Sequence, residues 1–124
     1  MPTAAEIRSA IESYVEFMCD GNVDGILELY TDDATAEDPV GGEIQRGRDA
    51  LRNFYSLTAP NLQVEITGPI CVSGLECAVP LLAELTVKDS KLYIDVIDVM
   101  AFDESGKITS MRAFWSPTDM RATR

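Results

Sequence analysis

The sequence predicts an α+β domain in which helices come first and a curved antiparallel sheet follows. Apolar residues recur every three or four positions as far as residue 57, and after Pro60 the period changes to two. Of the 124 residues, 46% are hydrophobic, enough to form a packed core. We therefore expect residues 1–124 to form a single domain whose helices pack on one face of the sheet.

The first helix is expected to follow Thr3, which forms a capping box with Glu6, and to end at Gly21. Its apolar stripe has the spacing of one helical face and comprises Ile7, Ile11, Tyr14, Val15 and Met18. Tyr14 is therefore predicted to point inward.

Two further helices are expected. Asn22 can cap a short one that carries Ile26, Leu27, Leu29 and Tyr30 and stops at the acidic segment Thr31-Asp32-Asp33. Another runs from near Gly47 to Leu57, with Ala50, Leu51, Phe54 and Tyr55 as its apolar set. Between them, the alternation of Ala34, Ala36 and Asp38 predicts a short strand that turns Asp38 inward.

The sheet is expected to continue at Leu62, where apolar and polar residues begin to alternate. Further strands are predicted at Ile70 to Ser73, Leu75 to Lys88, Leu92 to Phe102 and Ile108 to Ser116. Short turns separate these strands, so neighbours along the chain should pair in an antiparallel manner.

The segment from Leu92 to Phe102 is apolar on both faces, whereas an antiparallel sheet usually leaves one face in water. We expect the helices to cover one face and a second subunit to cover the other, giving a homodimer through the sheet.

The composition excludes several classes of function. The chain has 21 acidic and 10 basic residues, a net charge of −11, so nucleic acids and anionic membrane surfaces are not expected partners. It contains no histidine, which removes Ser-His and Cys-His pairs and HExxH zinc sites. Any acid or base must be Asp, Glu, Tyr, Lys or Cys.

The location is predicted to be cytoplasmic. The three cysteines, Cys19, Cys71 and Cys77, lack metal-binding spacing and are expected to be reduced and buried. The first twenty residues contain no signal-peptide apolar run, and no stretch approaches the roughly 18 apolar residues needed to cross a bilayer.

Asp95 and Asp98 stand in the doubly apolar strand, and their odd separation places them on opposite faces. Asp98 shares its face with apolar residues only, and no basic residue lies in this strand. Burying an unpaired carboxylate is costly, so we expect Asp98 to be protonated near neutral pH and to act as a hydrogen-bond donor.

Tyr14 can supply a second donor, and two donors in an apolar cleft can hold an oxyanion. Asp38, before Pro39 and the pair Gly41-Gly42, could lie at a pocket mouth as a base. Structural roles are also open: Tyr14 could close a core hydrogen bond, Asp98 could bond a backbone amide, and Asp-Pro is common in turns.

Three segments together resemble bacterial steroid Δ-isomerases, the ketosteroid isomerases, a family with a cone fold like that of nuclear-transport-factor-like domains. They are YTDDATAEDPVGG, DVIDVMAFDESGKI and ITSMRAFWS. The resemblance implies that Asp38 is the proton-shuttling base, Tyr14 an oxyanion-hole donor and Asp98 its protonated partner; this family is one of the standard examples of carboxyl pKa tuning. It also implies that Tyr55 and Tyr30 support the donors. Val40, Trp115, Met100 and Phe54 are assigned to the substrate cleft.

The implied reaction converts 3-oxo-Δ5-steroids to 3-oxo-Δ4-steroids through a dienolate, on a neutral hydrophobic substrate and without cofactor or metal. Two other readings stay open. A polyketide-cyclase-like enzyme of the same fold also handles enolates with acidic residues, and a non-catalytic module could use the cleft to carry a sterol or lipid.

Overall fold

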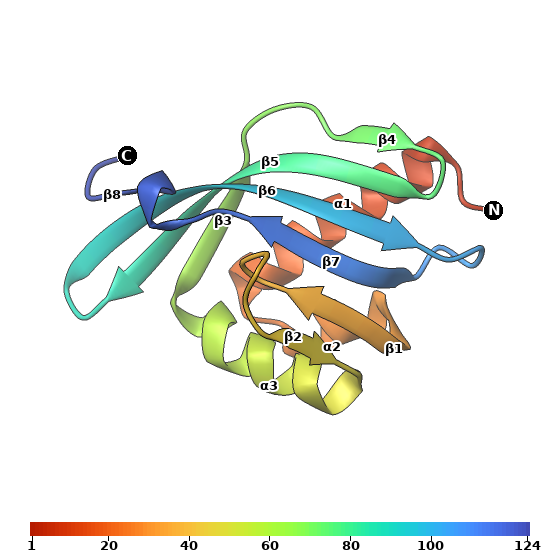
Figure 1. Cartoon of the computed structure of the whole chain (residues 1–124), viewed down its shortest axis with the longest axis horizontal. Coiled ribbons are helices and arrows are strands. Elements are labelled where there is room, and N and C mark those ends of the chain that lie inside the picture. Colours follow the sequence, from red (N-terminus) through yellow and green to blue (C-terminus); the bar gives the residue numbers. More distant parts are fainter.

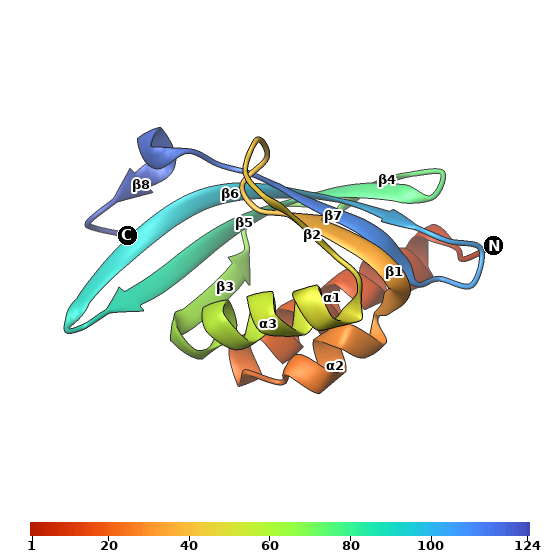
Figure 2. The same ribbon diagram turned by 60° about the horizontal axis from the view of Figure 1, so that its bottom comes forward.

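Three helices lie against one face of a single curved sheet of eight strands (Figures 1 and 2). They are α1 (Ala4–Asp20), α2 (Val23–Glu28) and α3 (Arg48–Thr58). The computed structural model describes all residues from 1 to 124. Figure 2 shows the sheet bending around the helices, which occupy its concave side. The predicted α+β class, with three helices on the concave face, is confirmed.

The helix ends follow the predicted capping chemistry. Thr3 accepts a hydrogen bond from the Glu6 N–H and Glu6 returns one to the Thr3 N–H, while Gly21 ends α1 with φ of 68°. Asn22 accepts from the Gly25 N–H and starts α2. One boundary differs from the prediction, because Tyr30 begins a strand instead of extending α2.

The sheet has the order β2-β1-β7-β6-β5-β3, with β4 pairing to β5 and β8 pairing to β6. Its strands are β1 (Tyr30–Glu37), β2 (Ile44–Arg46), β3 (Leu62–Ile66), β4 (Cys71–Ser73), β5 (Glu76–Val87), β6 (Ser90–Phe102), β7 (Ile108–Phe114) and β8 (Met120–Arg121). Two short 3₁₀ helices, η1 (Ala59–Asn61) and η2 (Pro117–Asp119), connect these elements.

One strand pair departs from the antiparallel prediction: β1 and β7 run parallel, with Ala36 beside Met111 and Glu37 beside Arg112. Parallel neighbours need a long crossover between them, and here the whole chain from β2 to β6 supplies it. The short strands β2 and β8 were also not predicted. Neither is long enough to show an alternating pattern.

The core lies between the concave face and the helices. The inward residues of α1 meet those of α3 and β6, and Asp98 is the one charged residue among the buried side chains. Asp95, three positions away, is exposed on the convex face, as its parity predicts. On that same convex face Ile97 and Phe114 are cross-strand neighbours that stay half exposed.

All three cysteines are free. Cys77 is buried, as predicted, but Cys71 is exposed. The register explains this difference, because β4 places Val72 beside Cys77 and Cys71 beside Ala78, so Cys71 faces the other way. No helix is long and apolar enough to cross a membrane.

Candidate active site

A cavity of about 270 Å³ lies between the helices and the concave face, close to the lower end of the range for small-molecule sites. Most of its wall is apolar, and half of the apolar lining residues come from β3, β5 and β6, namely Leu62, Val64, Leu81, Ala83, Leu85, Ile94 and Val96. Four polar side chains that the sequence singled out, Tyr14, Asp38, Tyr55 and Asp98, line the same cavity. It can therefore surround a hydrophobic molecule while presenting two carboxyls and two phenols to it.

Asp98 lies on the concave face of β6, opposite Val79 of β5, and is only 5% exposed. Burial, and after it the negative charge of Asp38, raise the pKa of Asp98 to about 8, and no hydrogen bond or cation offsets them. Asp98 is therefore predominantly protonated at pH 7. In that state it can donate a hydrogen bond to a ligand, as expected from the sequence.

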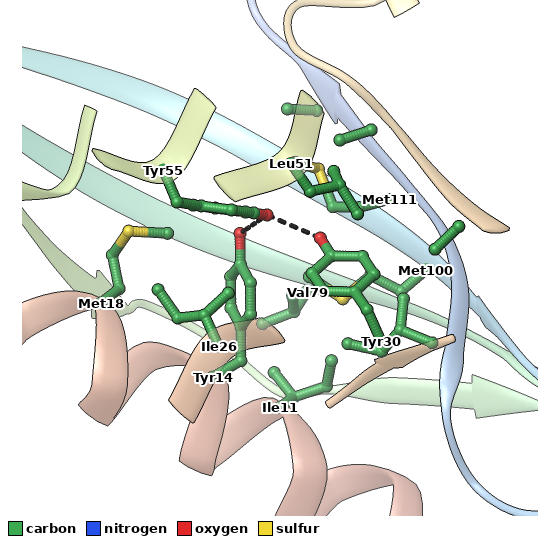
Figure 3. Close-up of a cluster of buried hydrophobic side chains, with 14 of the residues drawn as sticks. Ile11, Tyr14, Met18, Ile26, Tyr30, Leu51, Tyr55, Val79, Met100 and Met111 are labelled. Atoms are coloured by element: carbon green, nitrogen blue, oxygen red, sulfur yellow. Dashed lines mark hydrogen bonds between the residues drawn. The ribbon is translucent and has the colours of Figure 1, made fainter. Parts of the chain in front are cut away.

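Tyr14 of α1 belongs to a chain of three buried phenols (Figure 3). The Tyr14 hydroxyl lies 2.8 Å from that of Tyr55 on α3, and the Tyr55 hydroxyl lies 2.6 Å from that of Tyr30 on β1. Burial raises the pKa of all three phenols, so they stay protonated at neutral pH. Tyr55, predicted to support the donors, contacts Tyr14 directly, whereas Tyr30 reaches Tyr14 only through Tyr55.

The hydrogen bonds among these three phenols have a preferred direction when a ligand oxygen needs a donor. Each phenol carries one proton, so Tyr14 can donate to a ligand only if it accepts from Tyr55. Tyr55 must then accept from Tyr30. In this arrangement each hydroxyl donates in the direction of the cavity, and the buried Tyr30 is the first donor of the series.

Asp38 follows the last residue of β1 and is half buried at the cavity wall. The Trp115 indole Nε1–H donates to Asp38 Oδ1 at 2.6 Å. Burial raises the pKa of Asp38 above its ordinary value, and the bond from Trp115 opposes this shift. The peptide bond between Asp38 and Pro39 is cis. A carboxylate held through one oxygen leaves the other free to take a proton.

The predicted cleft residues divide into two groups. Phe54 and Trp115 line the cavity, whereas Val40 and Met100 do not. Met100 lies on the same strand face as Asp98 but two positions further along, where it is completely buried in the core (Figure 3). Val40 follows the turn, and its N–H donates to the Ala113 carbonyl at 2.8 Å. The assignment of Val40 and Met100 to the lining is corrected accordingly.

Several lining residues were missed. Leu81, Ala83 and Leu85 share one face of β5, so the period-two pattern could have identified them once Asp98 was placed. Leu57, Thr58 and Asn61 at the end of α3, and Met120 on β8, also line the cavity. No local pattern marked these four. The structure contains no group of three His, Cys, Asp or Glu side chains that could hold a metal ion.

Comparison with known proteins gives the family. Residues 11–111 match the SnoaL-like domain. The chain belongs to the SnoaL-like family. It is 39% identical over 121 residues to a steroid Δ-isomerase of Nocardioides simplex, covering 97% of this chain and 98% of that protein. The resemblance to steroid Δ-isomerases and the cone fold expected from it are thereby confirmed.

Other relatives are enzymes of a different reaction class. The epoxide hydrolase LasB of Streptomyces lasalocidi is 32% identical over 125 residues, which cover 82% of this chain and 44% of that protein. A solved structure of the epoxide hydrolase/cyclase-like enzyme SalBIII, described in connection with pyran ring formation in polyether salinomycin, superposes with a TM-score of 0.94 at 32% identity. The match covers 99% of this chain and 100% of that one.

Proposed function

We propose that this protein is a steroid Δ-isomerase that converts 3-oxo-Δ5-steroids to their conjugated 3-oxo-Δ4 isomers. The observation that carries the proposal is the shared cavity, in which one carboxyl with a pKa near 8 and one phenol face the same apolar space as a second carboxyl. The isomerase relative at 39% identity supports it.

In the first step Asp38 removes a proton from carbon 4 of the steroid, next to the ketone. The electron pair of the broken C–H bond moves into a dienolate, and negative charge develops on the ketone oxygen. Asp38 is a weak base for a carbon acid, so the barrier must be lowered by stabilising this oxyanion. Burial raises the pKa of Asp38, which makes its carboxylate a stronger base for this step.

Tyr14 and protonated Asp98 donate to that oxygen. Each donor is already inside a cavity with an apolar wall, so little reorganisation is needed as the charge forms. In other oxyanion holes such donors contribute on the order of 3 kcal/mol each. Asp98 can play this part only while it is neutral, which its burial ensures near pH 7.

In the last step Asp38 returns the proton to carbon 6 and the double bond becomes conjugated with the ketone. One carboxylate can serve both carbons when they lie on the same face of the rings. The transfer is then intramolecular and leaves the enzyme unchanged. All atoms balance without cofactor or metal, and the substrate is a neutral hydrophobic steroid.

The test is to incubate the purified protein, with nothing added, with 5-androstene-3,17-dione and to follow the ultraviolet absorbance of the conjugated product. Asp38→Asn should lose most of the turnover and keep steroid binding, because the amide is isosteric but cannot take the proton. Turnover in the Asn variant equal to that of the unmodified protein would remove Asp38 from this role.

A second candidate is opening of a hydrophobic epoxide, which the two epoxide hydrolase/cyclase relatives favour. In that reaction Asp98 would give its proton to the epoxide oxygen as the C–O bond breaks. Water, which yields a diol, or a hydroxyl group of the substrate, which yields a cyclic ether, would attack the carbon and lose its proton to Asp38. Formation of a diol or cyclic ether from an epoxide, without isomerisation of the steroid, would favour this function. Binding without either conversion would favour a carrier.

We also propose that the protein works as a homodimer through the convex face of the sheet, where Ile97 and Phe114 leave an apolar pair in solvent. Its predicted cytoplasmic location stays a prediction.

A further inference from the structure

Glu37 precedes the proposed base and uses both of its carboxylate oxygens. Its Oε1 accepts from Arg112 Nε at 3.1 Å, and its Oε2 accepts from the Gly41 N–H at 3.1 Å. The side chain is 17% exposed, much less than expected for a surface acid. One carboxylate thus joins the end of β1, the turn after Asp38 and the neighbouring strand β7.

These contacts hold the turn from both sides. Glu37 and Arg112 are neighbours in the parallel pair of β1 and β7, so their contact follows from the strand register. Further along, the Val40 N–H donates to the Ala113 carbonyl at 2.8 Å. Gly41 itself has φ of 96°, a conformation that glycine adopts readily and that accompanies its N–H contact with Glu37.

Arg112 is itself held in place on its other side. Its guanidinium carbon lies 5.2 Å from the centre of the Phe114 ring. The side-chain pair is therefore supported by stacking as well as by charge. Arg112 also balances the charge of Glu37, the chain neighbour of Asp38.

We propose that Glu37 is a positioning residue, which fixes the turn carrying Asp38 so that the Asp38 carboxylate meets the substrate carbons. The inference rests on the proposed isomerase function. Trp115 restrains the carboxylate at its tip, and Glu37 restrains the backbone from which it extends. Both restraints are needed, because a proton transfer between fixed atoms tolerates displacements of only a fraction of an ångström.

The test compares Glu37→Gln and Glu37→Ala with Glu84→Gln. Glu84 is the matched control, since it also accepts from a basic side chain, Lys91 at 3.0 Å, is 23% exposed and does not line the cavity. We expect kcat to fall about tenfold in Glu37→Gln and about a hundredfold in Glu37→Ala, with KM within about twofold. The affinity for a phenolic steroid reports on the donors Tyr14 and Asp98, and it should not change in either Glu37 variant. Glu84→Gln should keep kcat.

A second measurement does not depend on turnover. The chain has one tryptophan, so the Trp115 indole N–H gives one NMR signal, and its bond to Asp38 makes that signal sensitive to the carboxylate position. The chemical shift of this signal should change in Glu37→Ala and stay the same in Glu84→Gln. An unmodified protein that does not isomerise steroids refutes the proposed function, and the indole signal still tests the positioning. An active protein whose Glu37 variants keep both kcat and the indole signal refutes the positioning role, as does a loss confined to KM.

Discussion

The pKa of Asp98 predicts a dependence of protein stability on pH that one substitution should remove. In the folded protein this pKa is about 8, roughly four units above the ordinary value of 3.8. Between these two values the folded state keeps a proton that the unfolded state releases. The contribution of Asp98 to the free energy of unfolding is therefore fully present below pH 3.8 and is lost as the pH rises toward 8.

At about 1.36 kcal/mol per pKa unit, the rise from pH 4 to pH 7 removes about 4 kcal/mol of unfolding free energy. Other carboxyls contribute in the opposite direction, because the pKa values of Glu6, Glu37, Glu84 and Asp103 are lowered by their hydrogen bonds. The quantity to compare is consequently the difference between the unmodified protein and Asp98→Asn. The isosteric amide has no proton to lose, so its stability relative to the unmodified protein should increase by about 4 kcal/mol over this range.

The assay is urea unfolding at pH 4, 5.5 and 7, followed by far-ultraviolet circular dichroism at one protein concentration. Asp95→Asn is the control, because it removes an exposed carboxylate from the other face of the same strand. This control measures what the loss of an exposed carboxylate, and of its ion pair with Arg121, does to stability. A difference for Asp98→Asn that stays constant within about 1 kcal/mol would mean that Asp98 is charged in the folded state, and the oxyanion hole would lose its acid.

Three other predictions concern catalysis and assembly. The rate should rise with pH as Asp38, whose pKa burial has raised, becomes ionised, and fall near pH 8 as Asp98 ionises, giving a bell-shaped profile of kcat/KM in steady-state assays. Tyr55→Phe should lower kcat about tenfold and Tyr30→Phe only about threefold, because Tyr55 directly contacts Tyr14, the proposed oxyanion donor; equal losses would argue against a directed row of phenols. Ile97→Asp should convert the proposed dimer to a monomer in sedimentation velocity, and a monomeric unmodified protein would contradict the dimer.

Local patterns were sufficient to predict the three helices, the longer strands and the directions of the key side chains. The stripe of α1 placed Tyr14 inside, and parity along β6 separated buried Asp98 from exposed Asp95. The apolar set of α3 included Tyr55, which the structure places in contact with Tyr14. Each of these conclusions depends on a period within one helix or strand, which the sequence states directly.

Contacts between distant segments were not predictable in the same way. Trp115 donates to a carboxylate 77 positions away, and no local period relates the two. Met100 shows the limit of parity, which gives the face of a strand but not the position along it where the cavity ends and the core begins. The parallel pairing of β1 with β7 also depends on strand order, which hairpin signals do not report for segments so far apart.

That parallel pairing has a consequence for biosynthesis. Asp38 is translated well before β7, which pairs with its strand, and before Trp115, whose indole binds it. Helices α1 and α2 can form from local contacts while translation continues, whereas the proposed catalytic arrangement requires synthesis to have passed Trp115. Nascent chains arrested before residue 108 should therefore contain helices yet lack turnover.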